Sequence, residues 1–135
     1  MEGMELHINY LAVFVAALLS FVVGGLWYGP LFGKAWMKEA GFTEESVKNA
    51  KMGKIYGASF VLALVIAFNL AAFLGDKADL TWGLTAGALA GIGWVAASIG
   101  TIYLFGGKSL KLFFIDAGYQ AVTYTLMGGL LGVWR

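Results

Sequence analysis

The chain has 135 residues, of which 60% are hydrophobic and 13% are charged. A soluble domain carries about 25% charged residues, so this composition excludes an ordinary soluble protein and indicates a single membrane domain over residues 1–135. The formal net charge of +1 provides no basic field for nucleic acid, and the absence of cysteine excludes disulfides and thiolate metal sites.

The first apolar run predicts a membrane-spanning helix over residues 8–28. Ala16, Ser20 and Gly24 lie four residues apart, which gives this helix a face of small residues for close contact with another helix. Pro30 is expected to end the helix, because proline has no backbone N–H to donate and disfavours helix in the residue before it.

A long polar connection follows, over residues 31–54. Phe32 and Trp36 lie four residues apart, which suits a short helix in the membrane interface that stops at Gly41. Thr43 is expected to cap a second short helix, with the two glutamates that follow it in the first turn. The alternative is a solvated linker with only local helix, since runs of charge are usually solvated.

Residues 56–74 predict the second span and residues 82–105 the third, joined by a short hydrophilic turn. Small residues recur at four-residue spacing in both spans. They are Ser59, Ala63, Ala67 and Ala71 in the second, Gly83, Gly87 and Gly91 in the third, and Gly93, Ala97 and Thr101 on another face of the third. Glycine at this density would weaken a soluble helix, but in lipid it lets two helix backbones approach closely.

Residues 110–134 predict the fourth span, which contains the only acidic residue of the four spans, Asp116. Further polar residues share or adjoin its helix face: Tyr119, Gln120, Thr123 and Tyr124. A polar stripe on a membrane helix must face protein or water, so the other helices are expected to surround it. The predicted fold class is therefore an all-α transmembrane four-helix bundle, with a short cytoplasmic interfacial helical segment between helices 1 and 2.

The lysines predict the orientation. Those at one side of the predicted bundle are Lys34, Lys38, Lys48, Lys51, Lys54, Lys108 and Lys111, whereas the other side has only Lys77 and Arg135. The positive-inside rule then places both termini outside the cytoplasm. Aromatic residues at the span ends are expected to act as interfacial anchors: Trp27, Tyr28, Trp36, Trp82 and Trp134.

Polar residues of different spans fall at similar depths, so they are expected to meet in layers and form a ligand pocket or polar pathway. The candidates are Asp116, Tyr119, Gln120, Thr123, Tyr124, Ser20, Asn69, Ser98 and Thr101. The alternative is interhelical hydrogen bonding that only fixes the packing, at about 0.6 kcal/mol per bond. This alternative is preferred for Gln120, Asn69 and the hydroxyls, whereas Asp116 is expected to be functional. Asp116 should face the protein interior, and its possible partners are the hydroxyls of Ser20, Ser98, Thr101 or Tyr103, the Trp27 indole N–H or, alternatively, a lysine from the loops at the lysine-rich side. No catalytic, metal or cofactor site is predicted, and the only histidine, His7, is expected to be a tail residue.

Several segments resemble the signature of a bacterial family of small four-span membrane proteins that is known only as a domain of unknown function. They are Gly24-Gly25-Leu26-Trp27-Tyr28, Pro30-Leu31-Phe32-Gly33-Lys34 with Trp36, Leu110-Lys111-Leu112-Phe113, Ile115-Asp116-Ala117-Gly118-Tyr119, Met127-Gly128 and Trp134. The resemblance covers nearly the whole chain and implies four helices in the bacterial inner membrane. It implies no substrate.

Three functions remain open on the sequence. The first is a protein that binds or passes a small solute, ion or lipid as a homo-oligomer. The second is a structural or accessory subunit of a larger membrane complex. The third, a membrane-embedded enzyme, is the least supported, because the spans contain no histidine, cysteine or paired acids. The lipid bilayer is the expected partner in each case.

Overall fold

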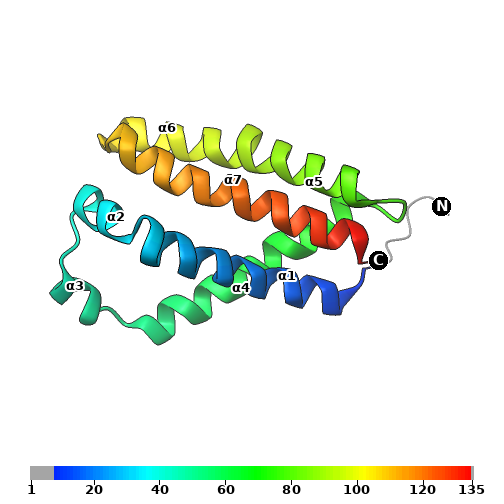
Figure 1. Cartoon of the computed structure of the whole chain (residues 1–135), viewed down its shortest axis with the longest axis horizontal. Helices are drawn as coiled ribbons and strands as arrows, with labels where there is room; N and C mark the ends of the chain where they lie inside the picture. Colours follow the sequence, from blue (N-terminus) through cyan, green and yellow to red (C-terminus); the bar gives the residue numbers. More distant parts are fainter. Residues whose placement is uncertain (1–7, 135) are drawn as a thin grey trace.

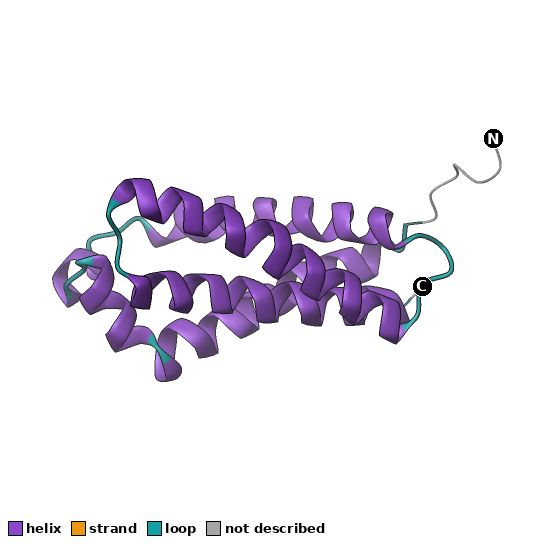
Figure 2. Ribbon diagram, turned by 90° about the horizontal axis from the view of Figure 1, so that it is seen from above, coloured by secondary structure: helices purple, strands orange, loops and turns teal. Residues whose placement is uncertain are grey.

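The computed structural model describes residues 8–134, and within this range the chain is all-helical apart from caps and turns, with no strand. Long helical segments run side by side along the long axis of the molecule (Figure 1). The loops that join them lie near its two ends (Figure 2). The all-α prediction is confirmed for the described residues; His7 and Arg135 lie outside them.

Three of the long segments are long and apolar enough to cross a membrane: Tyr10–Leu31, Met52–Leu74 and Leu80–Gly106. The fourth, helix α7 (Leu110–Val133), has 24 residues, which at about 1.5 Å per residue exceeds the roughly 30 Å of a bilayer core. Its sequence is less apolar, and it does not meet the same requirement. α7 contacts all three of the other long segments, so its polar residues can face protein.

The first long segment changes its helix type near its end. Helix α1 (Tyr10–Leu26) widens into a π-helix, η2 (Trp27–Leu31), which contains Pro30. In this turn the backbone N–H of Phe32 donates to the carbonyl oxygen of Trp27 at 2.8 Å, a bond across five residues. The wider turn accommodates proline, which has no backbone N–H, and the segment ends one residue later, at Leu31.

Two short helices connect the first and second long segments. Helix α2 (Gly33–Ala40) ends at Gly41, which has the left-handed φ of 81° that favours glycine. Helix α3 (Glu44–Lys48) begins at Thr43, whose side chain and that of Ser46 cap each other's backbone N–H groups. The stop and the cap expected from the sequence are both present.

The second and third long segments follow. The second is helix α4 (Met52–Leu74), and the third is a continuous run of α5 (Leu80–Ala88), the π-helix η3 (Leu89–Ala96) and α6 (Ala97–Gly106). Gly91 and Gly93 lie within η3, where the low helix propensity of glycine is compatible with a departure from α geometry.

Helices α5 and α7 lie in backbone contact through glycines. A Cβ atom on Gly83 would lie 2.1 Å from the carbonyl oxygen of Gly128, and one on Gly87 would lie 2.2 Å from that of Tyr124. No side chain fits at these positions, so the small-residue face predicted on the third span is a helix contact within the chain.

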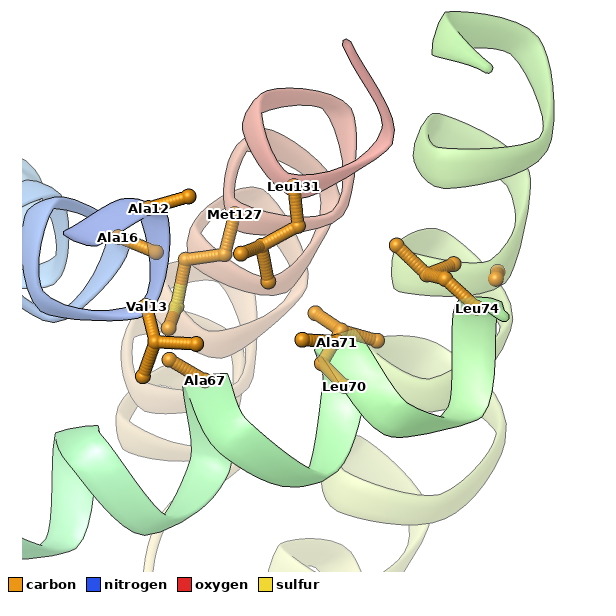
Figure 3. Packing of buried hydrophobic residues seen from close by; sticks show 10 residues of the cluster. Ala12, Val13, Ala16, Ala67, Leu70, Ala71, Leu74, Met127 and Leu131 are labelled. Carbon is orange, nitrogen blue, oxygen red and sulfur yellow. The ribbon is translucent and has the colours of Figure 1, made fainter. Parts of the chain in front are cut away.

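The apolar core lies between α1, α4, α5 and α7, toward the end of the molecule that holds the last turn of α7 (Figure 3). Its members are Ala12, Val13, Ala16, Ala67, Leu70, Ala71, Leu74, Ala86, Met127 and Leu131. Alanines on α1 and α4 let these helices approach, while Met127 and Leu131 of α7 fill the space between them. Buried apolar side chains therefore fill this end of the molecule.

Hydrogen bonds fix which segments share each end of the molecule. At one end the Asn9 amide donates to the carbonyl oxygen of Trp134 at 3.5 Å, so the start of α1 lies beside the end of α7. At the other end the Ser109 hydroxyl donates to Glu39 at 3.1 Å and joins α2 to the α6–α7 turn. The lysines around α2 and those beside Ser109 are therefore gathered at one end.

Candidate functional site

Asp116 lies half-buried in the second turn of α7 and accepts two hydrogen bonds. The Tyr28 hydroxyl donates to its Oδ1 at 2.6 Å, and the Tyr103 hydroxyl donates to its Oδ2. We call these three residues the Asp116 cluster. Because Tyr28 lies in η2 and Tyr103 in α6, one carboxylate joins the ends of two other long segments to α7.

The η2 turn is held against α7 by its tryptophan. The Trp27 indole N–H donates to the carbonyl oxygen of Ile115 at 2.8 Å. A Cβ on Gly118 would lie 2.9 Å from Cζ2 of the Trp27 ring, so the ring fits because position 118 carries no side chain. This contact fixes the turn next to Asp116 and brings Tyr28 within hydrogen-bonding distance of the carboxylate.

No cation pairs with Asp116 among the described residues, because its only side-chain interactions there are with the two tyrosine hydroxyls. Two neutral donors therefore hold the carboxyl group in place. The cluster lies about 9 Å along α7 from Leu110, at 1.5 Å per helical residue.

A pocket of about 250 Å³ lies farther along α7, between α1, α4 and α7. Its lining residues are Ser20 and Phe21 of α1, Ser59, Leu62, Ala63 and Ile66 of α4, and Tyr119, Gln120, Thr123, Tyr124 and Met127 of α7. We call it the α7 pocket. Its volume is far above the roughly 10–15 Å³ that one water needs and just below the usual range of small-molecule sites, about 300–1,000 Å³.

The α7 pocket contains polar groups that the protein leaves unsatisfied. Thr123 is 2% exposed, and its hydroxyl has no hydrogen-bond partner among the described residues. The Tyr119 hydroxyl lies near it but donates to the carbonyl oxygen of Ser20 at 3.0 Å, without hydrogen-bond geometry toward Thr123. The side-chain amide of Gln120 makes no hydrogen bond to another described residue either. An unpaired buried polar group costs about 1–3 kcal/mol, so the Thr123 hydroxyl requires an explanation, whereas the amide of the partly buried Gln120 is open to the pocket.

Tyr119 connects the pocket with the Asp116 cluster. Its ring meets that of Tyr28 edge to face, with the ring centroids 5.3 Å apart. A Cβ on Gly24 would lie 3.4 Å from the Tyr119 hydroxyl oxygen, so this side chain lies directly against α1. The pocket and the cluster therefore share one aromatic wall.

The structure gathers six of the nine candidates that the sequence predicts. Ser20, Tyr119, Gln120, Thr123 and Tyr124 line the α7 pocket, and Asp116 lies beside it. The other three, Asn69, Ser98 and Thr101, are exposed. Asn69 and Thr101 donate to carbonyl oxygens of their own helices, at 2.7 Å to Val65 and at 3.1 Å to Ala97.

The five predicted anchors lie in different surroundings. Trp27 and Tyr28 are half-buried against α7, with the hydrogen bonds described above. Trp36 is half-buried and stacks on Phe42 with the ring centroids 5.0 Å apart. Trp82 is exposed and its indole donates to the carbonyl oxygen of Leu74 at 3.0 Å, while Trp134 is exposed at the end of α7.

Sequence reasoning missed two polar residues of the site. Tyr28 was assigned to the aromatic belt, because nothing in the sequence shows that a π turn would bring it to Asp116. Ser59 was recognised only as a small residue, although its position four residues before the buried Ala63 indicates that it faces α1 and α7. Tyr103, one of the partners expected for Asp116, donates a hydrogen bond to it.

The α7 pocket offers a ligand neutral hydrogen-bonding groups. No charged side chain lines the α7 pocket. Among residues 8–134, no group of three or more His, Cys, Asp or Glu side chains could hold a metal ion. The pocket offers both donors and acceptors, through the amide of Gln120 and the hydroxyl of Thr123, in a wall that is otherwise mostly apolar.

Comparison with known proteins identifies a family. The model of a family described as "Protein of unknown function (DUF1761)" matches residues 11–132, which include all of α1 except its first residue and nearly all of α7. No curated protein and no solved structure matches the chain.

Proposed function

Since the chain belongs to the DUF1761 family, whose description assigns no activity, we propose a function from the geometry: a multi-pass membrane protein that binds a small solute or lipid in the α7 pocket. The buried, unpartnered hydroxyl of Thr123 carries the proposal. A polar group of this kind is stabilised when a ligand supplies its hydrogen bond.

The proposed topology has four spans in a bacterial inner membrane, with α7 as the fourth. Its length supports this, and so do its neighbours, because a helix surrounded by other helices can carry polar residues through a bilayer. We place the lysine-rich end in the cytoplasm, in keeping with the positive-inside rule. Both termini would then lie outside it.

Binding is better supported than passage of an ion. The pocket wall has no charged side chain, and an ion in it would lack a compensating charge. The apolar core of Ala67, Leu70, Met127 and Leu131 closes the route along α7 beyond the pocket. A site that is closed at one end holds a ligand and does not conduct it.

Native mass spectrometry of the purified protein tests this function. We expect a small molecule to remain bound to the wild type and to a variant with Ala58→Leu, since Ala58 is exposed. Ser59→Leu, one residue farther along the same helix, fills the pocket wall and should abolish retention. Equal retention in the two variants, or none in the wild type, would contradict the proposal.

We also propose that copies of the chain associate as a homo-oligomer through the exposed small face of η3 and α6, formed by Gly93, Ala97 and Thr101. No described atom lies within 4 Å of a Cβ placed on Gly93, so another helix could approach there. Ala97→Leu should lower the oligomer mass in mild detergent and in nanodiscs. Ile102→Leu, at an exposed large residue of the same helix, should leave it unchanged.

A further inference from the structure

We infer that the α7 pocket takes an uncharged, lipid-like molecule with a hydrogen-bonding head group, which reaches the pocket sideways from the bilayer between α4 and α7. This inference rests on the proposed function and narrows it to one class of ligand: a long-chain alcohol or a monoacylglycerol, with a hydroxyl or ester head.

The polar atoms of the α7 pocket determine which head group the ligand can have. The Thr123 hydroxyl and the Gln120 amide can each both donate and accept, and neither has a side-chain partner among the described residues. A hydroxyl or ester group can satisfy them. A carboxylate or an ammonium would be buried in a wall with no opposite charge, because Asp116 is outside the lining and bound by Tyr28 and Tyr103.

The other lining residues of the α7 pocket determine the apolar part of the ligand. Leu62, Ala63 and Ile66 of α4 face Phe21 of α1 and Met127 of α7 across the pocket. Thr123 lies about 20 Å along α7 from Leu110, close to the middle of the helix, at 1.5 Å per residue. A molecule that binds there lies at the depth of the acyl chains, where an apolar tail is favoured.

The route by which the ligand enters the α7 pocket follows from the residues that close the other sides of the pocket. Toward the last turn of α7, the apolar core of Ala67, Leu70 and Leu131 closes the pocket. Toward the lysine-rich end, Phe21 of α1 packs on Tyr56 and Phe60 of α4, with ring centroids 6.1 and 5.9 Å apart. Leu62 lines the pocket and is still 62% exposed. The open side of the pocket is therefore the flank of α4, which faces the bilayer in the proposed topology.

The closing experiment uses two matched pairs, one of ligands and one of variants. The ligands are 1-hexadecanol and hexadecanoate, which share a chain and differ in charge, each carrying a photoreactive diazirine in the chain. The variants are Thr123→Val, which removes the unpaired hydroxyl at nearly constant shape, and Thr125→Val on the same helix. The Thr125 hydroxyl donates to the carbonyl oxygen of Ala121 at 2.7 Å and is not part of the pocket lining.

We expect hexadecanol to crosslink to Leu62, Ile66 or Met127 in the full-length protein in nanodiscs. Thr123→Val should weaken this binding about tenfold, as expected for one lost hydrogen bond, and should raise the melting temperature of the ligand-free protein. Thr125→Val should change the affinity by less than about twofold. Weaker binding of hexadecanol together with a higher melting temperature would identify Thr123 as a ligand contact, because the loss of a structural hydrogen bond would lower the melting temperature.

Other outcomes overturn the inference in distinguishable ways. Tighter binding of hexadecanoate in the pocket would refute an uncharged ligand and leave the proposed function standing. So would retention of a water-soluble metabolite that competes with hexadecanol. No crosslink at any pocket residue, together with unchanged retention in Thr123→Val, would refute both the inference and the proposed function.

Discussion

Replacing glycine by alanine at two positions of the third long segment tests the packing on which the site depends. Gly83 of α5 lies against α7, and a Cβ there would be 2.1 Å from the carbonyl oxygen of Gly128. Gly93 of η3 has no described atom within 4 Å of the same added atom. The two substitutions are chemically identical and differ only in what the new methyl group meets.

The magnitude follows from the geometry. To bring the Cβ–O distance from 2.1 Å to the 3.0 Å below which real contacts are essentially never seen, α5 and α7 must part by about 0.9 Å. A gap of this size forfeits roughly a quarter to a half of the dispersion attraction at each affected contact. We therefore expect Gly83→Ala to destabilise the fold by about 1–3 kcal/mol, the usual range for an overpacked core.

Gly93→Ala should have the opposite sign. Alanine is favoured over glycine in a helix by about 1 kcal/mol, and no other segment of the same chain opposes the new methyl group at this position. Thermal unfolding in a detergent that keeps the protein monomeric, followed by circular dichroism, compares the two variants without a contact from the proposed homo-oligomer. At roughly 4 °C per kcal/mol, Gly83→Ala should lower the melting temperature by about 4–12 °C and Gly93→Ala should raise it by a few degrees. A Gly83→Ala protein that melts at or above the wild type would refute the backbone contact between α5 and α7.

Two further predictions concern the Asp116 cluster and the orientation in the membrane. Double-mutant cycles of Asp116→Asn with Tyr28→Phe and with Tyr103→Phe should each give a coupling of about 0.6 kcal/mol, and at most about 1.7 kcal/mol; additive effects would show that the carboxylate does not join these segments. Single cysteines at the exposed positions Lys48 and Lys77 should react differently with an impermeant thiol reagent on intact cells, with labelling at Lys77 alone; labelling at Lys48 alone would reverse the proposed orientation.

Much of the fold could be predicted from the sequence because its signals are local. Apolar runs gave the long helices, and the left-handed Gly41 and the Thr43 cap act within one turn. Pro30 shows the limit of such rules. Proline is expected to end a helix, and the first long segment does end one residue after it, at Leu31, but nothing near it in the sequence shows that the last turn is a π-helix.

The candidate site could be predicted only on α7, where helical spacing places Gln120 and Tyr124 on the face of Asp116. The partners from other helices depend on rotation and depth, which the sequence does not encode locally. Asn69 illustrates this: its depth matched the α7 residues, but its helix is rotated so that the amide is exposed and bonds to its own backbone. Tyr28 was missed for the converse reason, because η2 turns it toward α7.

The position of Thr123 argues that the α7 pocket is more than a packing defect. On one face α7 meets α5 so closely that Gly83 and Gly128 exclude even a methyl group. Yet on another face, in the same helix, a buried hydroxyl remains unpaired beside a space of about 250 Å³. A valine would occupy the volume of Thr123 without an unsatisfied group, and a larger apolar residue at Ser59 would fill much of the space. A chain that packs one face of α7 to backbone contact could also close the other, so the combination of an open space and an unpaired hydroxyl is best explained by a molecule that occupies it.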